Sequence, residues 1–310
     1  MNAFKIEGTQ MSIDDKGRER TDALLDDRSR RDFVALSAAA GLAAATGSIS
    51  AAQSKLVEED VEIKTADGIC DAAFIHPATG SHPGVLIWTD AFGLRPAFRE
   101  FGKRLATDGY SVLVPNPFYR SAKAPVYGDV SSIDFQNEAT REKMKGLMGP
   151  VTADGAAEAD AKSYIAFLSA HKQVDKSKKF GTQGYCMGGP LVMRTAAALP
   201  DLIGAGGSFH GGGLVTDNPD SPHLLAPRIK ARLYIAIAAN DDQKQPDAKD
   251  KLREAFAAAK VAAQIEVYPG TKHGWCVPDM PQQNGEPIYS KPDAERAWSK
   301  LMALYKAALV

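Results

Sequence analysis

The 310-residue chain has few cysteines, no excess of charge of one sign and no long apolar run. Its three cysteines, Cys70, Cys186 and Cys276, are too few for a disulfide-built scaffold and lack the C-x-x-C spacing of a structural zinc site. The 37 basic and 38 acidic residues give a formal net charge of −1, which argues against a nucleic-acid binder with a broad basic face. With 44% hydrophobic and 24% charged residues, the composition is that of an ordinary globular protein.

The chain also lacks the run of roughly 20 apolar residues that a membrane-spanning helix needs. We find no phosphate-binding loop, no dinucleotide-binding fingerprint and no metal-ligand cluster in the sequence. The sequence therefore predicts no cofactor, no metal site, no nucleic-acid partner and no membrane span in the body of the protein.

The N-terminal region carries a pattern typical of export signals. Residues 29–34 read Ser-Arg-Arg-Asp-Phe-Val, and a small-residue apolar run follows at Ala35–Ala45. This pattern resembles a twin-arginine export signal, whose motif is S/T-R-R-x-F followed by an apolar residue. Ser50 and Ala52 fill the two small-residue positions of a cleavage site. The alternative is that Ala35–Ala45 belongs to an alanine-rich amphipathic helix of the fold.

The resemblance implies a signal segment over residues 1–52 and an exported domain over residues 53–310. It further implies a periplasmic or secreted location, with the twin-arginine export machinery as a partner. Met11 is a second candidate for the start of the protein.

From about residue 56 onward, short β-type runs alternate with longer helical patterns, which predicts an α/β fold with one doubly wound, mostly parallel sheet. Val61–Lys64 and Ala72–Ile75 flank Asp67-Gly68 and predict an opening hairpin. Residues 208–232 predict only a long surface loop. Further strands are predicted at Val85–Trp88, Ser111–Val114, Lys179–Gly184, a segment ending near Ser208, Leu233–Ala238 and Gln264–Tyr268, and helices at Ala97–Thr107, Asn137–Leu147, Ala156–Ser169, Gly189–Leu199, Ala248–Ala259 and Ala294–Ala308.

A cysteine stands where the predicted strand Lys179–Gly184 meets the next predicted helix, within Gly184-Tyr185-Cys186-Met187-Gly188-Gly189. This is a G-x-nucleophile-x-G pattern in a strand–turn–helix setting, the nucleophile elbow of α/β-hydrolases. The turn needs glycines two positions to either side of the nucleophile, because side chains there would collide. The sequence therefore predicts Cys186 as an exposed nucleophile at a helix N-terminus, where a thiolate is favoured. A buried structural cysteine is the alternative.

A base and an acid follow in the chain order that this fold requires. Asp241 and Asp242 come after the predicted strand Leu233–Ala238, and His273 comes after Gln264–Tyr268. The carboxyl ends of parallel strands form one edge of the sheet, where ligands bind. Counting from the strand favours Asp241 slightly as the acid, but the sequence leaves both aspartates open.

These residues lead to a family: the chain resembles the dienelactone hydrolases, a cysteine-using branch of the α/β-hydrolases, over roughly residues 60–308. The resemblance rests on the elbow, on His273-Gly274-Trp275, on Asp90-Ala91-Phe92-Gly93 with Arg99-Glu100, and on Asp108-Gly109-Tyr110 leading to Pro115-Asn116-Pro117-Phe118-Tyr119-Arg120.

The resemblance implies roles for individual residues. Cys186 would be the nucleophile, His273 the base and later the acid, and one of the two aspartates its orienting partner. The family's D-x-x-x-P pattern, ending here at Pro246, favours Asp242 for that role. Backbone N–H groups of Ala91 and Met187 would form the oxyanion hole. The resemblance also implies that Asp90 and Arg120 are substrate-binding, with Asp90 contacting the resting thiol and Arg120 gripping a substrate carboxylate.

The predicted function is hydrolysis of a small-molecule ester or lactone through a thioester intermediate on the cysteine. A general carboxylesterase of similar mechanism and a non-catalytic binding protein of the same fold are the alternatives. Val277 stands where well-known family members have a second carboxylate-binding arginine. Cys276 is interpreted as a pocket-wall residue or as the oxidised partner of Cys70.

Overall fold

A computed structural model of the protein describes residues 55–310. The twin-arginine motif, the cleavage site and the boundary between residues 52 and 53 lie outside the described residues and stay predictions. Within residues 55–310, no helix has the length and apolar character needed to cross a membrane.

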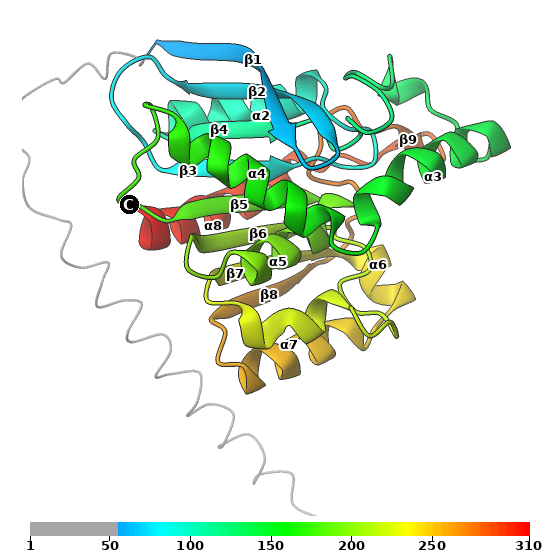
Figure 1. The fold of residues 1–310 in the computed structure, drawn as a ribbon. Helices are drawn as coiled ribbons and strands as arrows, with labels where there is room; N and C mark the ends of the chain where they lie inside the picture. The colour runs from blue at the N-terminus through cyan, green and yellow to red at the C-terminus, as the bar shows by residue number, and fades with distance from the viewer. Residues whose placement is uncertain (1–54) are drawn as a thin grey trace, which may run out of the picture. The chain divides into compact units, whose positions relative to one another are not determined.

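One eight-stranded sheet forms the centre of the fold, in the order β1-β2-β4-β3-β5-β6-β7-β8 (Figure 1). β1 and β2 form an antiparallel hairpin, and β2 is also antiparallel to β4. All remaining neighbours are parallel, so the carboxyl ends of six strands point to one edge. The strands are β1 (Leu56–Thr65), β2 (Gly68–Pro77), β3 (Gly84–Trp88), β4 (Ser111–Pro115), β5 (Phe180–Tyr185), β6 (Ile203–Phe209), β7 (Arg232–Ala238) and β8 (Ala263–Tyr268).

Helices cover both faces of this sheet (Figure 1). Alternate residues of β3 show how the two faces divide, because Leu86 and Trp88 pack into one apolar cluster and Val85 and Ile87 into the other. A strand buried on both faces needs a continuous apolar sequence, which β3 has. The first cluster includes residues of α4 (Ala156–Ala170), α5 (Gly188–Ala198) and α7 (Ala248–Ala258), and the second includes residues of α2 (Pro96–Thr107) and α8 (Lys291–Leu309).

The predicted α/β fold with a mostly parallel, doubly wound sheet is confirmed. The prediction that residues 208–232 form only a surface loop is wrong. That segment contains the short 3-10 helix η2 (Pro222–Arg228), which packs against α5, and Val215 and Ala226 are buried in the core. The sequence also gave no signal for three short elements: α6 (Ala239–Lys244), β9 (Gln282–Gln283) and β10 (Glu286–Pro287).

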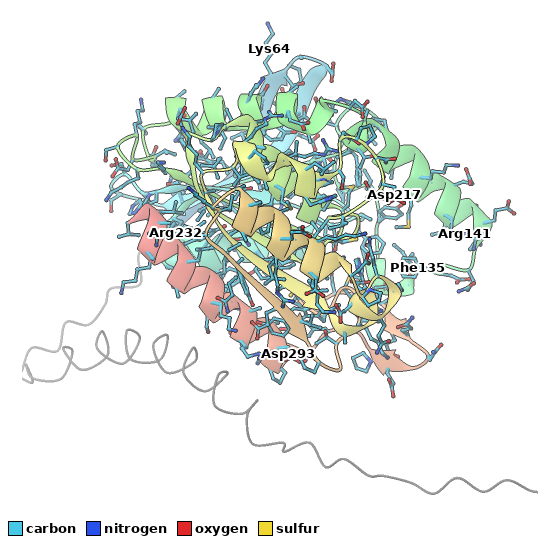
Figure 2. The ribbon with its side chains drawn as sticks, turned by 90° about the horizontal axis from the view of Figure 1, so that it is seen from below. Lys64, Phe135, Arg141, Asp217, Arg232 and Asp293 are labelled. Atoms are coloured by element: carbon cyan, nitrogen blue, oxygen red, sulfur yellow. The ribbon has the colours of Figure 1, made fainter. Side chains whose placement is uncertain are left out.

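The segment between β4 and α4 extends beyond the carboxyl edge of the sheet (Figure 1). It holds the 3-10 turn η1 (Val130–Ser132) and α3 (Glu138–Thr152), whose Asn137 side chain caps the helix by accepting from the Thr140 amide. Figure 2 shows Phe135 and Arg141 on the part of this segment that projects farthest from the sheet. The segment therefore overhangs the edge at which the predicted site residues lie.

Candidate active site

Cys186 occupies a tight turn between β5 and α5. Its φ of 53° lies in the left-handed region, and its amide donates to the Phe209 carbonyl at 3.1 Å. A Cβ atom at Gly184 would lie 2.1 Å from the Gly188 oxygen, and one at Gly188 would lie 2.6 Å from the Trp88 oxygen. Both glycines are therefore required for the turn to close, as the G-x-C-x-G pattern predicts.

The predicted oxyanion-hole residues flank this turn. Met187 immediately precedes α5, and Ala91 follows β3, whose Trp88 pairs with Gly184 of β5. Within residues 55–310, the amides of Ala91 and Met187 donate to no other protein atom. Two N–H groups near the cysteine are thus available to an incoming oxygen, which is the arrangement that stabilises an oxyanion.

His273 and Asp241 form a close pair. The Nδ1 atom of His273 lies 2.6 Å from Oδ2 of Asp241, and both side chains are half-buried. The segment that carries His273 is fixed by a second contact, since its amide donates to Oδ1 of Asn240 at 2.9 Å. Asn240 was not predicted from the sequence, although its place beside the two aspartates at the end of β7 is a signal that could have identified it.

The electrostatics of His273 favour its charged form. Burial disfavours the imidazolium, but hydrogen bonds to Asp241 and to Cys186 outweigh burial and raise the pKa of His273 to about 10. His273 thus interacts with Cys186 on one side and is hydrogen-bonded to Asp241 on the other. An imidazolium next to the sulfur stabilises a thiolate, the reactive form of cysteine.

Asp242, the alternative acid, points elsewhere. Its carboxylate accepts from Nζ of Lys249 at 2.7 Å. Successive residues of a helix are turned by about 100°, so two adjacent aspartates on α6 face different neighbours. The structure brings Asp241 to His273 and Asp242 to α7.

His210 packs directly against His273, with ring centroids 5.0 Å apart in an edge-to-face arrangement. Only 1% of its surface is exposed, and neither of its ring nitrogens has a partner among the described residues. Burial and the proximity of His273 lower the pKa of His210 far below its usual value. His210 is therefore a buried, neutral residue that packs against the ring of His273.

Comparisons with known proteins agree with this geometry. The model of the dienelactone hydrolase family matches residues 70–309. The chain belongs to the dienelactone hydrolase family. It is 28% identical over 290 residues to a protein of Methylorubrum extorquens named "Putative carboxymethylenebutenolidase", covering 90% of this chain and 92% of that one.

A second relative supports the assignment, and a solved structure shares the fold. The "Carboxymethylenebutenolidase" of Rhodococcus opacus is 27% identical over 198 residues, which is 64% of this chain and 71% of that protein. Among solved structures, a dienelactone hydrolase-like promiscuous phosphotriesterase from metagenomic libraries superposes with a TM-score of 0.67 at 22% identity, covering 82% of this chain and 99% of that one. Membership of the dienelactone hydrolase family confirms the predicted fold and reaction class, so the protein is a hydrolase of carboxylic esters, a class that includes lactones.

The structure gives Asp90 and Arg120 hydrogen-bond partners other than those that the resemblance to the dienelactone hydrolases implied. Asp90 is 1% exposed, and both its oxygens accept from Arg95, at 2.6 and 2.9 Å. One of them also accepts from the Phe92 amide at 2.9 Å. Within the described residues Asp90 makes no hydrogen bond to Cys186, because these donors occupy its short side chain.

Arg120 is likewise engaged with other residues of the protein. Its guanidinium donates to both oxygens of Asp160, each at 2.8 Å, and to Asp67 at 2.7 and 2.8 Å. Asp160 is 2% exposed, so its charge needs this partner. Arg120 thus ties the β1–β2 turn to α4, and the substrate-binding role that the resemblance implied stays a prediction.

This arrangement predicts that Arg120→Met destabilises the protein by about 3 to 5 kcal/mol, because it leaves the buried Asp160 charge without its cation. KM should change equally for acidic and neutral esters. Lys123→Met is the matched control, since Lys123 pairs with Glu62 in the open and should have no measurable effect. Urea denaturation and steady-state kinetics test both variants; unchanged stability with a selective rise in KM for acidic substrates would instead assign Arg120 to substrate binding.

The remaining cysteines are separate from the site and from each other. Cys70 belongs to one core cluster and Cys276 to the other, on opposite faces of the sheet. Both are free thiols, so the interpretation of an oxidised pair is wrong. Burial raises the pKa of Cys70 to about 12 and that of Cys276 well above its usual value, which leaves both unreactive. Val277 is also completely buried and presents no group to a ligand.

Proposed function

We propose that the protein hydrolyses a small-molecule ester or lactone through a thioester on Cys186. The observation that carries this proposal is the grouping of Cys186, His273 and Asp241 at the edge of the sheet, where His273 interacts with the sulfur that the elbow presents and is hydrogen-bonded to Asp241. A binding protein of the same fold has no need for all three groups in this order.

In the first half of the reaction, the Cys186 thiolate attacks the carbonyl carbon while His273 holds the proton that came from the thiol. The carbonyl oxygen becomes an oxyanion and accepts hydrogen bonds from the amides of Ala91 and Met187. The intermediate then collapses, the C–O bond breaks, and His273 gives its proton to the departing alkoxide. With a lactone, the new hydroxyl remains part of the acyl group.

In the second half, neutral His273 takes a proton from water, which attacks the thioester carbonyl. Collapse of this second intermediate breaks the C–S bond, releases the carboxylic acid and returns the Cys186–His273 pair to its starting state. Asp241 binds Nδ1 of the imidazole, which leaves the other ring nitrogen to exchange the proton with the sulfur, the leaving group and water.

An aromatic group beside the oxyanion turn favours an apolar or aryl substrate portion. Phe92, next to Ala91, packs against Tyr127 at 5.7 Å and Phe135 at 5.9 Å between ring centroids. Phe135 is 37% exposed on the overhanging segment. Because Arg120 and Val277 offer no free cation, we expect neutral esters and lactones to be accepted at least as well as acidic ones.

A panel of neutral and acidic lactones and aryl esters, assayed with purified protein, tests the proposal. Turnover that disappears when Cys186 is alkylated supports it. Tight binding of these compounds without turnover would favour the binding-protein alternative instead.

We further propose that the protein is exported through the twin-arginine route, on the basis of the motif at residues 29–34. Changing Arg30 and Arg31 together to lysine should abolish export, and the exported wild-type protein should begin near Gln53. Cell fractionation with intact-mass measurement checks both points. Exported protein that still begins at Met1 or Met11 would contradict the cleavage.

A further inference from the structure

Arg95 sits between the two segments that carry the proposed oxyanion amide and the proposed base. Its side chain is 3% exposed, at the start of α2. Nη1 and Nη2 donate to Asp90, at 2.6 and 2.9 Å, and Nε and Nη2 donate to Asp279, at 2.8 and 2.9 Å. One guanidinium therefore holds two carboxylates, both through paired hydrogen bonds, which fix direction as well as distance.

The Asp90 side of this contact fixes the turn that contains Ala91. Oδ1 of Asp90 accepts from the Phe92 amide, its carbonyl accepts from the Gly93 amide at 3.1 Å, and Arg95 donates to the Gly93 carbonyl at 3.2 Å. These bonds leave the intervening Ala91 little freedom. Because an oxyanion hole works through the direction of its N–H groups, Arg95 controls a group that the reaction uses.

The Asp279 side fixes the segment that follows His273. Between them the chain is folded on itself, with the Val277 amide donating to the Gly274 carbonyl at 3.0 Å and the Met280 amide to the Val277 carbonyl at 3.4 Å. A Cβ atom at Gly274 would lie 2.6 Å from Cε of Met280, so this fold is close-packed. Holding Asp279 therefore restrains His273.

We propose that Arg95, through Asp90 and Asp279, is a positioning residue that sets the oxyanion turn and the His273 segment relative to each other. The proposal rests on the proposed roles of Ala91 and His273. Among the described residues Arg95 makes no hydrogen bond to Cys186 or His273, so it acts on them only through Asp90, Asp279 and the Gly93 carbonyl.

A second arginine on α2 provides a matched comparison. Arg99, four residues after Arg95, pairs with Glu58 at 2.8 Å and Asp60 at 2.5 Å. Both partners belong to β1, which carries no proposed site residue. Breaking the Arg99–Asp60 pair removes another hydrogen-bonded arginine–aspartate pair near the start of α2 without releasing either site segment.

The experiment compares Asp279→Ala with Asp60→Ala. We measure kcat and KM for an ester that the wild type hydrolyses, and the pH dependence of Cys186 alkylation by iodoacetamide. Asp279→Ala should lower kcat about tenfold, because misplacement by a fraction of an ångström is enough for such a loss, with KM within about twofold. Its alkylation at pH 7 should also slow, because a displaced imidazolium supports the thiolate less. Asp279→Asn, which keeps an oxygen acceptor, should fall between Asp279→Ala and the wild type.

Asp60→Ala should leave kcat, KM and the alkylation profile unchanged. A wild-type kcat and alkylation profile in Asp279→Ala would overturn the proposal, and so would an equal loss in Asp60→Ala. If the wild type hydrolyses no ester or lactone, the proposed function fails, whereas the alkylation profiles still decide whether Arg95 positions His273.

Discussion

We expect Cys186→Ala to lower kcat by a factor of about 10⁴ to 10⁶ while the protein remains folded. The loss follows from the mechanism, because the thioester forms on this sulfur and water attack without it lacks a covalent intermediate. Stability should be preserved for two reasons. The side chain is only partly buried, and alanine keeps the Cβ atom, so the left-handed backbone at φ 53° carries the same strain in both proteins.

Cys70→Ala is the matched control for this variant. Cys70 is buried in the core on β2, which carries no proposed site residue, so its loss should reduce the free energy of unfolding and leave kcat near that of the wild type. Ester hydrolysis, circular dichroism and thermal melting measure the two effects separately. A Cys186→Ala variant with a tenth of the wild-type rate would refute the assignment of Cys186 as nucleophile.

The elbow could be predicted from the sequence because its requirements are local. Gly184 and Gly188 are needed within five residues of chain, and the structure shows the backbone contacts that exclude any side chain there. The alternation of strands and helices is local in the same sense, since periodicity is visible within each segment. His273 was placed by its position after a late strand, which fixes the sheet edge where it lies.

Contacts between distant segments could not be predicted in this way. Arg120 has the position expected of a substrate-binding arginine, but its partners, Asp67 and Asp160, lie 53 and 40 residues away and gave no signal in the sequence. Arg95 was missed for the same reason, because Asp279 is 184 residues away. Residues 208–232 were predicted to be a surface loop because glycine and proline are typical of loops. A few apolar side chains of this segment nevertheless pack into the core.

Local sequence patterns could not decide which of the two aspartates orients His273. Their directions depend on α6, a helix of only six residues, which is too short to show a helical periodicity in the sequence. In the structure this helix begins directly after β7 and turns Asp241 toward His273, whereas Asp242 faces Lys249. The two residues have the same chemistry and adjacent positions, so substituting each in turn separates the role of the carboxylate from general effects of losing a charge on α6.

We expect Asp241→Asn to lower kcat by a factor of about 10² to 10⁴, because an amide in place of the carboxylate no longer selects the imidazole tautomer that can accept the proton of the thiol. Asp242→Asn loses only a half-buried ion pair with Lys249 and should keep kcat within about threefold of the wild type. Steady-state kinetics on one ester compare the two variants directly. Two equally mild losses would mean that neither aspartate orients His273.

The pH dependence gives a second test of the same pair. Asp241 and Cys186 together raise the pKa of His273 from 6.5 to about 10, so their interaction with the imidazolium contributes stability that is complete below pH 6.5 and is lost as the pH rises to about 10. The destabilisation caused by Asp241→Asn should therefore be largest at pH 6.5 and shrink toward pH 10. Iodoacetamide should also alkylate Cys186 more slowly at pH 7 in this variant, because the imidazolium beside the sulfur loses its proton at a lower pH. A constant destabilisation across this range would show that Asp241 supports α6 and not the charge of His273.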